Sequence, residues 1–181
     1  MGLQANWKAM FAIVSQAVGV GGSMVFGFVS SWLFGREYSD GTMKDLLALP
    51  VSRTRIALAK FGVYALWSLL LAGSNLIIGL LLGVMLGLEG SPFALKASDV
   101  SLYWETAVLT ILADVPIAYF ALRGKGYLAP LGFLALTLVL SQIVAAFGFG
   151  TYFPWSIPGI YSGSAGTGAA APGKGAAAAG A

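Results

Sequence analysis

The amino-acid sequence predicts an all-α protein, a polytopic transmembrane bundle with about four spans in this chain. Hydrophobic residues make up 58% of the 181 residues and charged residues only 9%, whereas a soluble domain carries about a quarter charged residues. This composition excludes a water-soluble enzyme and, with 13% aromatic residues, a disordered chain. The sequence contains no cysteine and no histidine, which excludes disulfides, thiolate or imidazole metal ligands and histidine-based catalysis.

Four apolar runs are long enough, or nearly so, to cross a hydrocarbon core of roughly 30 Å. They cover about 9–34, 61–88, 106–122 and 127–148, and the third is the shortest. Residues 1–161 are therefore predicted to form a transmembrane domain. Residues 162–181 are rich in glycine and alanine, which give too little hydrophobic drive for insertion, so this segment is predicted to be a flexible tail.

The distribution of basic residues predicts the orientation. The segment between the first two runs and the turn between the last two hold seven lysines and arginines, and the opposite side holds three. Because short cytoplasmic loops are enriched in these residues, we expect both segments in the cytoplasm and both chain ends outside. A chain that starts outside is expected to follow an earlier span, so this orientation favours the interpretation that the chain is a fragment that has lost a preceding span. The alternative, a signal peptide in the first run, is disfavoured by the length of this run and the lack of a clear cleavage site.

Small residues recur at every fourth position in two of the runs, a pattern that lets helix backbones approach closely in a membrane. The members are Ser15, Gly19, Ser23, Gly27 and Ser31 in the first run, and Gly79, Gly83 and Gly87 in the second. Two interpretations remain open at this stage. Each ridge either packs against another span of the same chain or faces a second membrane subunit.

Four strongly polar side chains fall inside the apolar runs, namely Gln16, Asn75, Asp114 and Gln142. A carboxylate at the depth of Asp114 costs roughly 2.5–3.5 kcal/mol on insertion scales, so we expect it to face the bundle or a cavity. A hydrogen bond from Asn75 or Gln142 would give Asp114 a structural role. A substrate path or a proton relay is the functional alternative.

The segment 35–60, GREYSDGTMKDLLALPVSRTRIALAK, predicts a short amphipathic helix over 42–49. Thr42 followed by Asp45 resembles a capping box, and an apolar stripe at helical spacing follows. The stripe consists of Met43, Leu46 and Leu47.

Pro50 is predicted to end this helix and Ser52 to cap the next one. The short helix could lie in the lipid head groups or dock into a protein groove, and its mixed charges and brief stripe favour the groove.

The same segment resembles the region after the second membrane helix in permeases of ABC-2 type transporters. The shared pattern joins an acidic residue and Gly-Thr to a Leu-rich helix, then to P-x-S/T-R and a lysine. The matching positions are Glu37, Tyr38, Gly41, Thr42, Leu46, Leu47, Pro50, Ser52, Arg53 and Lys60. Two further strings, RGKGYLAPLGF (123–133) and YFPWSIPGIYSG (152–163), are similar to permeases of bacitracin and lantibiotic export or immunity systems.

This resemblance implies a plasma-membrane permease subunit that forms the translocation path of an exporter for an antibiotic or amphipathic peptide. The implied partners are a cytoplasmic ABC ATPase, which would bind ATP and Mg²⁺, and a second permease copy or homologue, with no nucleic acid. No cofactor is expected in this chain, and no phosphate-binding G-x-x-x-x-G-K-[ST] motif occurs in it. The residues implied to carry ATPase coupling are Glu37, Tyr38, Gly41, Thr42, Met43, Leu46, Leu47, Pro50 and Arg53.

Complete members of the resembled family are expected to have six spans, so the first and last are expected to be missing from this chain. Two other function classes remain open. One is a structural or assembly subunit without transport activity. The other is an intramembrane enzyme that uses Asp114, for which the spans offer few other polar groups, namely Asn75, Gln16 and Gln142.

Overall fold

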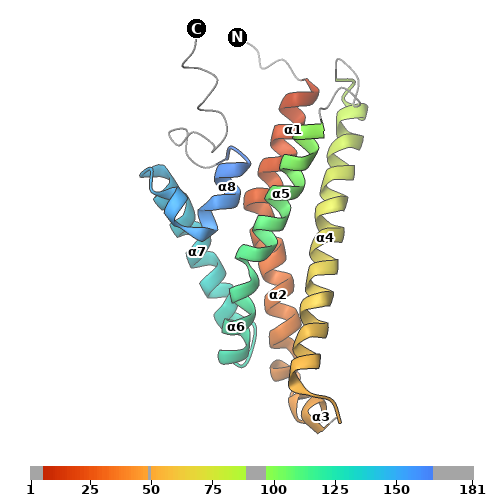
Figure 1. The fold of residues 1–181 in the computed structure, drawn as a ribbon, viewed down its shortest axis with the longest axis vertical. Coiled ribbons are helices and arrows are strands. Elements are labelled where there is room, and N and C mark those ends of the chain that lie inside the picture. Colours follow the sequence, from red (N-terminus) through yellow and green to blue (C-terminus); the bar gives the residue numbers. More distant parts are fainter. Residues whose placement is uncertain (1–5, 49, 89–96, 165–181) are drawn as a thin grey trace.

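The computed structural model describes residues 6–48, 50–88 and 97–164, and this part of the chain forms an elongated helical bundle (Figure 1). Its elements in order are α1 (Trp7–Gln16), the π-helical turn η1 (Ala17–Gly21), α2 (Gly22–Ser39), α3 (Met43–Ala48), α4 (Arg53–Met85), α5 (Ala97–Ala113), α6 (Val115–Arg123), α7 (Leu128–Ala146), the 3₁₀ turns η3 (Gly150–Tyr152) and η4 (Pro154–Ser156), and α8 (Ile157–Tyr161). Four helical segments within it are long and apolar enough to cross a membrane: Trp7–Ser39, Arg53–Met85, Ala97–Arg123 and Leu128–Ala146. The predicted all-α bundle of four spans is confirmed.

The long α4 runs along one side of the first segment, while α6, α7 and α8 cover its other side (Figure 1). The short α3 lies at the end of the bundle where α2 stops and α4 starts, and the turn between α6 and α7 points toward this same end (Figure 1). The start of α1 and the segment around α8 lie toward the opposite end (Figure 1). The two segments rich in basic residues therefore share one end, as their predicted common location requires.

The third span is longer than the sequence predicted, because α5 begins at Ala97 instead of residue 106. The extra turns contain polar residues that interrupt the apolar run. They nevertheless form helix because one side packs inward, with Tyr103 fully buried and its hydroxyl donating to the Ala72 carbonyl at 2.6 Å. A prediction from uninterrupted apolar length misses such an amphipathic start.

The ridge of small residues in the first segment is a packing surface within this chain. All five of its members are buried. A Cβ atom added at Gly27 would lie 2.7 Å from Leu134 of α7 and 2.9 Å from Ile117 of α6. A Cβ atom at Gly19 would lie 2.9 Å from the carbonyl oxygen of Pro158 in α8. The intrachain interpretation therefore holds for this ridge.

The second ridge packs on α1 over two of its three positions. A Cβ atom at Gly79 would collide with Val14, and one at Gly83 would lie 2.6 Å from the Trp7 ring. Gly87 was wrongly assigned to this ridge. It ends α4 with a φ of 61° in a Schellman motif, its N–H bonding to the Val84 carbonyl at 3.0 Å while that of Leu88 bonds to the Gly83 carbonyl at 3.3 Å.

Neither predicted amide partner pairs with Asp114. The Asn75 amide nitrogen donates to the Val14 carbonyl at 3.2 Å and to the Tyr103 hydroxyl at 3.1 Å, which ties α1, α4 and α5 together. Gln142 is exposed on α7. The physical reason is position along the bundle, since Asn75 lies near the Val14 level of α1, well away from the junction of α5 and α6 that holds Asp114.

The packed part of the chain continues beyond the predicted domain boundary at 161. Ser162 is buried, and its hydroxyl donates to the Gly159 carbonyl at 3.0 Å. The Ser164 hydroxyl donates to the same carbonyl, also at 3.0 Å. The rest of the predicted tail, residues 165–181, lies outside the described residues.

Replacing Gly27 with leucine is expected to destabilise the bundle, because the added side chain would enter the space of Leu134 and Ile117. Overpacking of this kind costs about 1–3 kcal/mol. Gly132→Leu on α7 is the matched control, since a Cβ atom there meets no described atom within 4 Å. Thermal unfolding of the purified membrane protein in detergent measures both variants. Equal melting temperatures for the two variants would contradict the packing role of Gly27.

Candidate functional site

The candidate site is the connection between α2 and α4, built around the short helix α3. Asp40 is the C-cap of α2, and Gly41 follows with a φ of 72°. The N–H of Gly41 bonds to the Tyr38 carbonyl at 3.4 Å. Residues with a Cβ atom pay roughly 1–2 kcal/mol in this left-handed region, so the glycine lets the chain leave α2 sharply and begin α3 two residues later.

The far side of the connection is fixed by a serine cap. Ser52 has extended backbone angles, and its hydroxyl accepts the N–H of Arg55 at 3.4 Å. This confirms the sequence prediction that Ser52 caps the helix leading into the second span. An N-cap of this kind typically contributes about 1 kcal/mol, so α4 begins at a defined residue.

A partly buried ion pair ties the two ends of the connection together. The Lys60 ammonium of α4 lies 2.5 Å from a Glu37 carboxylate oxygen of α2, and the two side chains are only 14% and 23% exposed. The same ammonium donates to the Leu33 carbonyl at 3.2 Å and lies 5.5 Å from the centre of the Phe34 ring. One lysine therefore holds the last turns of α2 against the first turns of α4.

A second ion pair on α2 is of a different kind. Arg36 and Asp40 lie 3.1 Å apart, but their side chains are 56% and 51% exposed. Exposed pairs of this type contribute about 0–1 kcal/mol. The structural tie at this end of the bundle is thus the pair of Glu37 and Lys60.

The structure gathers the predicted coupling residues into one short stretch. Tyr38 is half-buried in the last turn of α2, while Thr42, Pro50 and Arg53 are exposed. The Thr42 carbonyl accepts the N–H of Asp45 at 3.1 Å, at the start of α3. The stripe residues Met43, Leu46 and Leu47 lie within α3.

Sequence reasoning missed the role of Lys60 as the partner of Glu37. Both residues belong to the ABC-2-like pattern, but they are far apart along the chain and only the packing of α2 on α4 brings them together. A search for opposite charges flanking a loop between two apolar runs is the signal that could have found them. Glu37, which the resemblance implies to carry ATPase coupling, is paired within its own chain.

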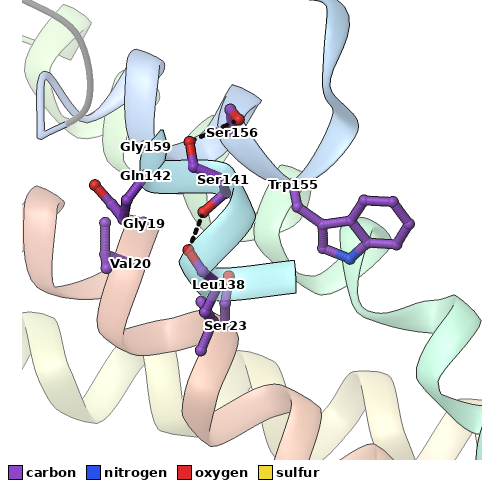
Figure 2. Close-up of a pocket in the computed structure, with 9 residues that line it drawn as sticks. All are labelled: Gly19, Val20, Ser23, Leu138, Ser141, Gln142, Trp155, Ser156 and Gly159. Carbon is purple, nitrogen blue, oxygen red and sulfur yellow. Dashed lines mark hydrogen bonds between the residues drawn. The ribbon is translucent and has the colours of Figure 1, made fainter. Parts of the chain in front are cut away.

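Inside the described bundle, a cavity of about 10 Å³ lies between the first segment, α7 and the region before α8. Figure 2 shows the Ser156 hydroxyl bonding to the Ser141 carbonyl beside it, with the Trp155 ring turned away from Gln142. This volume suits about one water molecule. No group of three or more acidic residues that could hold a metal ion is found among the described residues.

A wider groove of about 580 Å³ lies on the surface between α5 and α8. It is lined by Ser101, Trp104, Glu105, Val108, Leu109 and Tyr161. Its lining combines aromatic and aliphatic side chains with the exposed Glu105 carboxylate.

A comparison with known families gives the class of membrane protein to which this fold belongs. Residues 1–143 match the family described as ABC-2 family transporter protein, so the chain belongs to this family. With its four apolar segments it is a multi-pass integral membrane protein of the plasma membrane.

Among curated proteins, the chain is similar to the bacitracin transport permease protein BCRB of Bacillus licheniformis. The two are 28% identical over 135 residues, which are 75% of this chain and 65% of that relative. The chain therefore spans slightly less than two thirds of the length of the relative it matches. No solved structure matches this chain. The family indicates a transporter component and not an enzyme.

Replacing Lys60 with methionine is expected to loosen the two ends of the connection. The apolar stem is kept, but Glu37 is left as a partly buried carboxylate without its cation, and an unmet polar group of this kind costs about 1–3 kcal/mol. Thermal unfolding of the purified protein should show this loss for Lys60→Met and much less for Lys60→Arg, which keeps the charge and the donors. Arg36→Met is the control on the same helix and should cost less than about 1 kcal/mol. If Arg36→Met were as destabilising as Lys60→Met, the pair of Glu37 and Lys60 would not be the structural tie.

Proposed function

We propose that this chain is the membrane permease subunit of an ABC exporter and that α3 is the helix through which a cytoplasmic ATPase moves the spans. The observation that carries this proposal is the way the flanking residues fix α3 between the ends of two spans. It lies between two long spans that cross the bundle, with the Gly41 turn on one side and the Ser52 cap on the other. The ion pair of Glu37 and Lys60 joins the ends of these spans that lie next to α3. A movement of α3 would therefore move both spans.

The proposed contact with the ATPase is made by the apolar stripe of Met43, Leu46 and Leu47. Glu37 acts in this proposal by positioning α3 and not by touching the ATPase, because its carboxylate is already bound to Lys60. Arg53, exposed at the first turn of α4, is suited to contact lipid head groups. ATP and Mg²⁺ bind to the partner ATPase, and a second permease copy or homologue completes the translocation path.

The proposed cargo is an amphipathic peptide antibiotic. The similarity to a bacitracin transport permease protein supports this class. The groove between α5 and α8 supports it too, since Trp104 and Tyr161 offer aromatic surface beside the Glu105 carboxylate. Such a lining suits a molecule that has apolar groups together with a positive charge.

Leu46→Asp tests the coupling helix, because it places a charge in the proposed apolar contact. Burying one leucine is worth roughly 1.5–3 kcal/mol, so ATPase affinity should fall about 10- to 100-fold. Co-purification of the ATPase from membranes and transport-dependent antibiotic resistance of the cells should be lost together, while insertion of the permease is unchanged.

Lys44→Asp is the matched control, since it adds the same side chain to an exposed position of α3 outside the stripe. It should retain ATPase binding and resistance. A Leu46→Asp permease that binds its ATPase and transports normally would refute the coupling role of α3. An ATPase that never co-purifies with the unmodified permease would favour a structural or assembly subunit.

The proposed orientation places α3 in the cytoplasm. Ser39 and Ser98 are exposed in the structure and lie toward opposite ends of the bundle, so each is suited to replacement by a single cysteine. The chain itself has no cysteine to interfere. A membrane-impermeant thiol reagent applied to intact cells should label Ser98→Cys and spare Ser39→Cys. The reverse labelling pattern would invert the orientation and place α3 out of reach of ATP.

A further inference from the structure

A carboxyl group is buried at the break in the third span. Asp114 is the single residue between α5 and α6, and its side chain is fully buried. The backbone is continuous but bent here, since Pro116 has no N–H to donate and the N–H of Ile117 turns back to the Asp114 carbonyl at 3.1 Å. Both carboxyl oxygens of Asp114 lack a hydrogen-bond partner in the described part of the chain.

The neighbouring side chains offer little to stabilise a negative charge. The Tyr64 hydroxyl of α4 donates its hydrogen bond to the carbonyl of Ile111, three residues before Asp114, at 2.9 Å and not to the Asp114 carboxyl. Elsewhere on the helices of the described bundle, the buried hydroxyls of Ser30 on α2 and Ser68 on α4 also lack a hydrogen-bond partner. None of these groups carries a positive charge.

The charged groups on the packed helices lie elsewhere. Arg36 and Glu37 come at the end of α2, Arg53, Arg55 and Lys60 at the start of α4, and Arg123 at the end of α6, all toward the α3 end. Lys8 of α1 and Asp99 and Glu105 of α5 lie toward the opposite end. Lys60 is already bound to Glu37. The helix α7 contains no charged residue.

An ionised carboxylate without a donor or a cation is very unfavourable away from water, and intramembrane carboxyls of this kind characterise proton pathways. We infer that Asp114 is a proton-binding residue: its carboxyl carries a proton in the packed conformation and releases it when the helices around the 113–116 break separate and admit water. Proton binding by Asp114 needs only the packed bundle and is independent of the proposed transport function.

The bend gives proton release a structural consequence. The segments α5 and α6 are joined at Asp114 and both pack against α2, while α5 also packs against α4, η1 and α8, and α6 against α7. An ionised Asp114 would disfavour closing the junction again, so loss of the proton stabilises the open arrangement. The proton thus acts as a ligand that binds the closed bundle better than the open one.

Infrared spectroscopy of the protein in lipid vesicles at neutral pH tests this inference directly. The spectrum should contain the carbonyl stretching band of a protonated carboxylic acid, and Asp114→Asn should remove this band completely. Glu105→Gln, at an exposed acidic position in the same span, should leave the band unchanged. Carboxyl groups in water are ionised at this pH and do not contribute to it.

A second measurement avoids the variant, in case Asp114→Asn does not fold. Isotopic labelling of the aspartate carboxyl carbons in the unmodified protein should shift the acid band, and raising the pH should convert this band into that of a carboxylate. An unmodified protein that shows only carboxylate bands at neutral pH, or an acid band that aspartate labelling does not shift, would overturn the inference.

Discussion

The close approach of helix backbones to the first long segment is the constraint on which the rest of the bundle depends. Inside a bilayer there is no hydrophobic force to bring helices together, so association relies on close packing and on hydrogen bonds between helices. Small residues along Trp7–Ser39 make this packing possible. As a result this segment contacts α4 and α5 on one side and α6, α7 and α8 on the other, and the remaining spans are arranged around it.

Much of the fold could be predicted from composition and spacing. Apolar runs predicted the four spans. Small residues at every fourth position predicted the two packing surfaces that contain Gly27 and Gly79. Local chemistry predicted the Ser52 cap, because a cap depends only on its own neighbours. These features are encoded within a few turns of helix, which is why a single sequence reveals them.

The features that could not be predicted depend on which helices meet. The polar start of α5 is helical because Tyr103 packs inward, and no rule based on apolar length contains this information. The binding of Glu37 to Lys60 depends on the packing of α2 against α4. The isolation of Asp114 from the amides of Asn75 and Gln142 depends on the relative depth of three helices. In the connection between α2 and α4 the sequence pattern included both Glu37 and Lys60, but only the structure shows that they bind each other.

The π-helical turn at Ala17–Gly21 has a consequence for how the first span tolerates changes in length. A π-turn accommodates one residue more than the α-helix around it, and each residue of an α-helix adds a rotation of about 100°. The wider turn absorbs this rotation, so Trp7 and Val14 face the glycines of α4 despite the extra residue. Loss of one residue here, with closure of the turn to α-helix, would keep α1 in the same orientation relative to α2. The first span can therefore lose one residue at this turn and still pack on α4.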